Sequence, residues 1–269
     1  METVTPSERD QVRERSDVSA GGLHAIVRRL GEEELERKAM ALAFSAVAAG
    51  MTIGFSLVAQ AVLQAHLPET QWKPLVVRLG YPVGFLLVIL GKQQLFTENT
   101  LTPVLPVLTH RTATVFQKLL RLWGIVLAGN LVGAHLMAWL LAVTPAMGPS
   151  YKAAMSELSL EMLGVDPWTA LVRGVFAGWL IAMVAWLRPS APREQIPLIA
   201  VLTYLVAAGE FTHVVAGAVE ALYPVMTGEA PYLPVMAGWI APTLAGNVLG
   251  GVTFVAALNH AQVFATDHS

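Results

Sequence analysis

The chain carries the same pair of short motifs twice, and this internal repeat restricts the folds that it can adopt. LFTEN at 95–99 is followed by GNLVG at 129–133, and EFTHV at 210–214 is followed by GNVLG at 246–250. The two Phe-Thr pairs are 211 − 96 = 115 residues apart, and the two Gly-Asn pairs are 246 − 129 = 117 residues apart. These similar offsets predict that the second half of the chain is a diverged copy of the first.

The composition indicates a polytopic membrane protein. Hydrophobic residues make up 55% of the 269 residues and charged residues only 13%, and the mean hydropathy is +0.56. A soluble domain of this size rarely has such a composition. The chain has no cysteine, which excludes disulfides and thiolate metal sites.

Six membrane spans are expected. Three stretches without charged residues each exceed the roughly 20 residues that cross a bilayer, and they predict spans one, three and six within 39–68, 122–151 and 230–266. The other spans contain a few charged residues and are expected at about 75–108, 168–186 and 196–222.

The distribution of Lys and Arg predicts the orientation. These residues gather before span one, between spans two and three and between spans four and five, so both termini are predicted to be cytoplasmic, in a multi-pass inner (cytoplasmic) membrane protein. Three spans per copy then make the repeat an inverted one. The polar N-terminus does not resemble a signal peptide. Residues 144–166, between the two repeats, are expected to form an acidic loop on the outer side.

The expected organisation has three parts. Residues 1–36 form a cytoplasmic tail with a helix-compatible amphipathic stretch, residues 37–263 form the channel domain, and residues 264–269 form a C-terminal tail. Within the channel domain, the repeats cover about 37–143 and 167–263.

Spans two and five are expected to be broken helices. Polar residues and glycine interrupt them at about 91–102 and 209–213. Unwound backbone at membrane depth is tolerated only where it is buried in protein or lines a wet cavity, and paired breaks in two repeats are typical of a midplane solute site. The N-termini of the new half-helices would offer free N–H groups and partial positive charge to an anion. A simple kink with incidental polar residues is the alternative, which the presence of two related breaks disfavours.

The Gly-Asn motifs are expected to serve packing. Their glycines include pairs at small-xxx-small spacing, which allows helices to approach closely. Asn130 and Asn247 are expected to support the breaks by hydrogen-bonding the loose backbone, in preference to contacting solute.

These motifs together resemble the formate/nitrite transporter family, most closely its YfdC-like branch. The resemblance covers nearly all of residues 37–259 and includes the Leu-Phe-Thr loop, both Gly-Asn motifs, an Arg-Gly pair at 173–174 and a Phe-x-His motif at 211–213. It implies an all-α membrane protein whose protomer is aquaporin-like. It also implies a homopentamer in which each protomer has a pore for small monovalent anions, such as formate, nitrite or hydrosulfide, or for their conjugate acids.

The resemblance also implies residues for the solute path. A loop at one constriction is formed by Leu95, Phe96 and Thr97. An aromatic pair, Tyr81 and Phe85, forms the other apolar slit. The central polar residue is His213, which follows Phe211 and Thr212. The reference pKa of histidine, about 6.5, makes His213 the natural partner of a permeating weak acid. His213 could lend a proton to a permeating anion or supply a hydrogen bond to it, and the residues do not separate these mechanisms.

The charged and polar residues of the breaks depart from the family pattern. Glu98 follows the Leu-Phe-Thr loop, Glu210 replaces an acid adjacent to the histidine, and Lys92 and Asn99 lie in the first break. Glu98 and Glu210 are expected to occupy nearly equivalent places in the two repeats. Because exposed carboxylates would repel an anion, both are expected to face away from the pore and tie down the breaks, with Lys92 as a partner of Glu98.

Other functional classes fit less well. The residues offer no metal-ligand cluster and no phosphate-binding glycine loop, so an enzyme is not expected, and neither is a cofactor, a metal or a nucleic-acid partner. A passive pore for small neutral solutes, or a proton-coupled carrier that uses the intramembrane carboxylates, remains the alternative to an anion channel.

Overall fold

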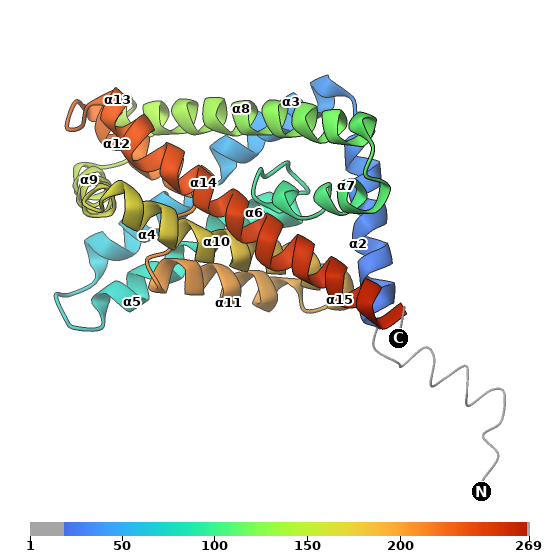
Figure 1. The fold of residues 1–269 in the computed structure, drawn as a ribbon. Helices are drawn as coiled ribbons and strands as arrows, with labels where there is room; N and C mark the ends of the chain where they lie inside the picture. Colours follow the sequence, from blue (N-terminus) through green and yellow to red (C-terminus); the bar gives the residue numbers. More distant parts are fainter. Residues whose placement is uncertain (1–18, 268–269) are drawn as a thin grey trace, which may run out of the picture.

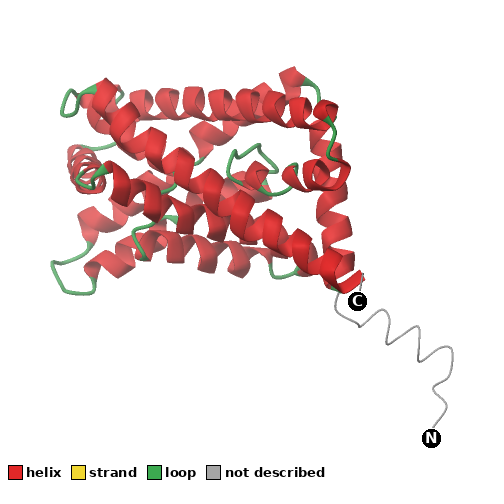
Figure 2. Cartoon of the chain, viewed as in Figure 1, coloured by secondary structure: helices red, strands yellow, loops and turns green. Residues whose placement is uncertain are grey.

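The computed structural model describes residues 19–267, and the secondary structure of this part of the chain is helical, without strands (Figures 1 and 2). The N-terminal helix α2 spans Ala20–Leu35. The first repeat contains α3 (Ala39–Thr52), α4 (Phe55–His66), α5 (Lys73–Val77), η1 (Arg78–Gly80), α6 (Pro82–Leu90), η2 (Glu98–Thr100), α7 (Val104–His110) and α8 (Ala113–Val143). After α9 (Pro149–Leu163), the second repeat contains α10 (Pro167–Leu187), η3 (Arg188–Ser190), α11 (Gln195–Ala208), α12 (Val214–Thr227), α13 (Tyr232–Val235), η4 (Met236–Ile240), α14 (Ala241–Leu249), η5 (Gly250–Ala257) and α15 (Leu258–Asp267).

Five helical stretches of the described chain are long and apolar enough to cross a membrane. They are Ala39–His66, Lys73–Leu90, Ala113–Val143, Pro167–Ser190 and Tyr232–Val263. The shorter apolar helices α11 and α12 have 14 residues each and follow one another in the sequence. The chain is therefore a multi-pass membrane protein.

Two helices stop where the sequence predicts breaks. Helix α6 ends at Leu90 and α7 begins only at Val104, while α11 ends at Ala208 and α12 begins at Val214. In each case the chain leaves the helix through a residue with left-handed backbone, Lys92 (φ 52°) or Glu210 (φ 53°). Such a residue commonly ends a helix, because it lets the next N–H groups bond back to the last carbonyls.

Glycine allows the long helices to pack closely in both repeats. Helix α8 lies against α3, and α14 with η5 lies against α10. A Cβ atom on Gly133 would be 2.2 Å from the Val47 carbonyl oxygen, and one on Gly250 would be 2.1 Å from the Val175 carbonyl oxygen. Only glycine permits these backbone contacts.

The connection between the repeats is helical, which differs from the expected outer loop. Helix α9 begins after Gly148 with Pro149 and buries Met155 and Leu158. Because this buried face packs on α4 and α12, tertiary contacts stabilise a helix that has little apolar periodicity of its own.

The two ends of the helical bundle are capped by different helices. Helix α2 lies across one end, near the C-terminal helix α15, and α9 lies at the opposite end (Figure 1). Leu23 and Val27 of α2 are buried, so residues 20–35 form a packed helix and not only a solvated tail. The predicted C-terminal tail is also shorter than expected, because α15 continues to Asp267. Residues 1–18 and 268–269 lie outside the described part.

Candidate functional site

The two breaks meet at a hydrogen bond between Thr97 and His213. The Thr97 hydroxyl oxygen lies 2.7 Å from Nε2 of His213. These side chains are 0% and 1% exposed, although they lie 116 residues apart in the chain. The fold therefore joins the Leu-Phe-Thr loop of one repeat to the histidine of the other.

The second nitrogen of His213 fixes the direction of this hydrogen bond. The backbone N–H of Ala216 donates to Nδ1 of His213 over 3.1 Å, so Nδ1 carries no proton. In the neutral imidazole the proton is then on Nε2, and Nε2–H donates to the Thr97 oxygen. The Thr97 hydroxyl hydrogen remains available as a donor to a solute beside the pair.

Aromatic side chains continue from His213. The Phe85 ring lies edge-on to the His213 ring with centroids 5.0 Å apart, and Tyr81 lies 5.1 Å from Phe85. Both rings are buried. The predicted aromatic pair therefore borders the histidine directly.

A cavity of about 250 Å³ is lined by residues from His213 to the C-terminal end of α9. It is named the outer cavity here because the predicted orientation puts the α9 end on the outside. Four of the predicted path residues line it, namely Tyr81, Phe211, Thr212 and His213. Leu95 and Phe96 do not line this cavity, and Phe96 instead packs on Trp123 with ring centroids 5.7 Å apart.

The Asn130 side chain holds the first break. Its Oδ1 accepts from the backbone N–H of Phe96 at 2.9 Å. Its Nδ2 donates to the carbonyl oxygens of Ala46 and Gln94, both at 2.8 Å. All three bonds are to backbone groups, two of which lie in the break.

Asn247 holds the second break in the same way. Its Oδ1 accepts from the N–H of Val214 at 2.8 Å. Its Nδ2 donates to the carbonyl oxygens of Gly174 at 2.8 Å and Thr212 at 2.9 Å. The N–H groups of Val214 and Ala216 are thus bonded within the protein, so α12 offers fewer free N–H groups to an anion than the sequence suggested.

These hydrogen bonds correct the register of the repeat. Phe96 and Val214 bond equivalent asparagines, and Lys92 and Glu210 share the left-handed backbone. Both pairs are 118 residues apart (214 − 96 and 210 − 92). The 115-residue alignment of the Phe-Thr pairs is therefore displaced by three residues, and Glu98 and Glu210 are not equivalent.

The predicted pairing of Lys92 with Glu98 is wrong. Glu98 forms an ion pair with Arg188 at 2.9 Å, and Lys92 is exposed. Glu210 also has an arginine partner, Arg173, at 2.9 Å. Contrary to expectation, Glu210 lines the outer cavity, as does its partner Arg173.

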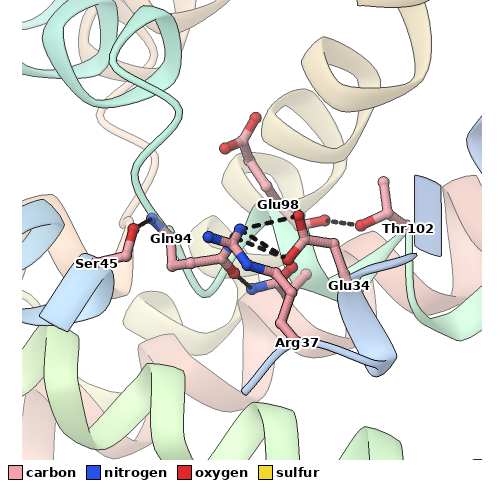
Figure 3. A network of polar contacts seen from close by, with 7 residues as sticks. Glu34, Arg37, Ser45, Gln94, Glu98 and Thr102 are labelled. Atoms are coloured by element: carbon pink, nitrogen blue, oxygen red, sulfur yellow. Dashed lines mark hydrogen bonds and ion pairs between the residues drawn. The ribbon is translucent and has the colours of Figure 1, made fainter. Parts of the chain in front are cut away.

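A polar network connects the first break to the N-terminal helix (Figure 3). Gln94 donates to the Glu34 carboxylate at 2.9 Å and accepts from Asn99 at 3.0 Å, and Arg37 pairs with Glu34 at 3.2 Å. The Ser45 hydroxyl accepts from the Gln94 N–H at 3.0 Å. The sequence analysis missed the role of Glu34, because it assigned this residue to the N-terminal tail. Nothing in the local sequence around Glu34 indicates that it contacts Gln94 in the first break.

Comparison with known proteins is consistent with this architecture. A family model described as "Formate/nitrite transporter" matches residues 22–261. "Inner membrane protein YfdC" of Escherichia coli (strain K12) is 40% identical over 244 residues, which cover 91% of this chain and 79% of that protein. A "Probable formate transporter" of Methanothermobacter thermautotrophicus is 26% identical, over 78% of this chain and 84% of its own length.

Solved structures share the fold. A "Pentameric formate channel with formate bound" superposes with a TM-score of 0.70 at 20% identity, covering 84% of this chain and 98% of its own. An "FNT family ion channel" gives a TM-score of 0.75 at 18% identity, covering 91% and 98%.

Proposed function

The chain belongs to the formate/nitrite transporter family, and we propose from this membership that it conducts small monovalent anions or their conjugate acids. Members of this family are channels and transporters, so the protein functions in anion transport and not in catalysis. The proposed route runs through each protomer, from the outer cavity past His213 and Thr97. Leu95, Phe96 and Phe85 are proposed to form the apolar constrictions that flank this pair.

The hydrogen bond between Thr97 and His213 is the observation that carries the proposal. It lies where the two breaks meet, next to a cavity and aromatic rings, and it leaves one hydroxyl hydrogen free to donate. An anion or a weak acid that loses its water at an apolar constriction needs such a donor, because an unpaired charge there is costly.

We further propose a homopentamer in the inner membrane, with both termini cytoplasmic. The pentameric channel of the same fold and the inner membrane relative support this assembly and location. Large apolar side chains such as Phe44, Val201 and Trp168 are 72%, 63% and 71% exposed, which fits contact with lipid or neighbouring protomers.

Flux into vesicles tests the function. Purified protein in vesicles is expected to pass formate, nitrite or hydrosulfide at rates well above protein-free vesicles, while small neutral solutes such as urea and glycerol pass slowly. An anion channel carries current, a neutral pore carries none, and a coupled carrier follows the proton gradient. Rapid flux of neutral solutes without anion flux would overturn the proposal.

A further inference from the structure

The outer cavity narrows toward His213. At its rim, the side chains of Glu161 and Glu210 are 64% and 54% exposed. At its inner end, the lining residues Trp239 and His213 are only 2% and 1% exposed. A solute that has crossed the open part of the cavity therefore meets its first tight passage where Trp239 borders the cavity, next to His213.

The ring of Trp239 lies directly on Gly217 of α12. A Cβ atom at Gly217 would be 2.2 Å from Cη2 of Trp239, and its three nearest neighbours would all be carbons of the six-membered ring. Gly217 also lines the cavity, and its N–H donates to the His213 carbonyl at 2.9 Å. The edge of the ring thus lies about one helical turn from His213, at the cavity wall, where a side chain at position 217 would otherwise be.

The backbone around Trp239 is π-helical. In η4, which packs against α12, the N–H of Ala241 bonds the carbonyl of Met236, five residues earlier. Pro242 follows, and it has no N–H with which to continue an α-helical series. The π-helical turn includes one more residue in each hydrogen-bonded ring than an α-helix does, so it changes which side chains of span six face α12. Short π-helical segments of this kind are frequent at functional sites.

The contact between Trp239 and Gly217 leaves little room for the passage to widen. The indole is planar and rigid, and both residues are buried, so the ring cannot move away without displacing other packed side chains. A smaller side chain at position 239 would leave space beside Gly217, because a packed interior collapses only partly after such a substitution. The size of the side chain at position 239 therefore sets the width of the passage.

We propose that Trp239 is a specificity-determining residue of the transport path. Its ring, which lies on Gly217, limits the width of the passage next to His213, so that formate passes while monocarboxylates with longer carbon chains are retarded. This inference rests on the proposed function and adds to it a residue that selects among anions by their size.

Flux of a series of monocarboxylates tests this role. Vesicles that contain the full-length protein would be assayed with formate, acetate and propionate at the same pH, and the flux into protein-free vesicles would be subtracted. One methylene in a closely fitting apolar pocket is worth roughly 10- to 200-fold in selectivity, so Trp239→Leu should raise the propionate-to-formate flux ratio at least about tenfold over the wild type. Trp168→Leu is the matched control, because Trp168 is 71% exposed and does not line the cavity, and it should keep the wild-type ratio.

A second substitution tests the contact itself. Gly217→Ala adds a Cβ atom where the Trp239 ring lies, so it should lower the thermal transition by roughly 2–10 °C. The double variant Gly217→Ala/Trp239→Leu removes the ring atoms that this Cβ would meet, and it should melt at a higher temperature than Gly217→Ala. The added Cβ also refills part of the space, so the propionate-to-formate ratio of the double variant should lie between those of the wild type and Trp239→Leu.

The wild-type flux ratio in an assembled Trp239→Leu protein would overturn the inference. If this variant does not assemble, Trp239→Phe takes its place, since its ring is smaller than indole and should raise the ratio at least about threefold; the wild-type ratio in that protein would count equally against the inference. If wild-type vesicles pass formate but the ratio is the same in all variants, the inference fails while the proposed function stands. If the wild type passes no anion, the proposed function fails as well.

Discussion

Replacing His213 by Phe is expected to lower anion flux by roughly 10- to 100-fold at every pH between 5 and 8. Phenylalanine cannot hydrogen-bond, and it leaves the Thr97 hydroxyl without its orienting partner. The magnitude corresponds to losing one hydrogen bond to a charged group. Flux of formate into vesicles across pH 5 to 8 measures this loss.

Two features make this test interpretable. His213 also caps α12 through Nδ1, and losing a cap costs about 1 kcal/mol, so the variant should still assemble. Glu98→Gln is the control, since Glu98 pairs with Arg188 away from the outer cavity, and it should change flux much less. Wild-type flux in the assembled His213→Phe protein would eliminate this histidine as a determinant of conduction.

Replacing Asn247 by Leu is expected to produce the largest loss of stability. The side chain has similar volume but leaves the Val214 N–H and the Thr212 carbonyl, which lie in the break, without their partner. At about 1–3 kcal/mol for each unpaired buried group, the cost is roughly 2–6 kcal/mol. Thermal denaturation followed by size-exclusion chromatography should show a transition lowered by roughly 5–20 °C.

The repeat supplies an internal replicate of this experiment. Asn130 makes the corresponding three hydrogen bonds in the first break, so Asn130→Leu should destabilise the protein to a similar extent. Within residues 19–267, the Asn259 side chain of α15 bonds only the Val255 carbonyl of the preceding η5, and Asn259→Leu should be nearly neutral. If all three variants melt alike, the asparagines do not support the breaks.

The sequence predicted the family, the helical membrane fold and the positions where helices stop. These features depend on local composition, because glycine and polar residues within apolar segments end helices at nearly the same place in any context. The observed ends at Leu90 and Ala208 lie directly before the predicted breaks.

The pairing of charges could not be predicted in this way. Arg188 reaches Glu98 from a connection 90 residues away, whereas Lys92 is close in sequence but turned outward by its left-handed backbone. The two Phe-Thr pairs gave the wrong offset between the repeats. Equivalent positions are those whose backbone N–H groups bond the equivalent asparagines, Phe96 and Val214, and these differ from the positions with identical residues.

The absence of cysteine allows a direct test of the proposed route through each protomer. Ala207 lines the outer cavity, and Ala146 is exposed outside it. Each would be replaced by cysteine, labelled completely with methyl methanethiosulfonate as verified by mass spectrometry, and assayed for formate flux. If the solute passes through the cavity, labelling of Ala207→Cys should reduce formate flux at least tenfold, and excess formate should slow the labelling reaction. The labelled Ala146→Cys protein should conduct formate as the unlabelled protein does. Undiminished flux through fully labelled Ala207→Cys would contradict a path through this cavity.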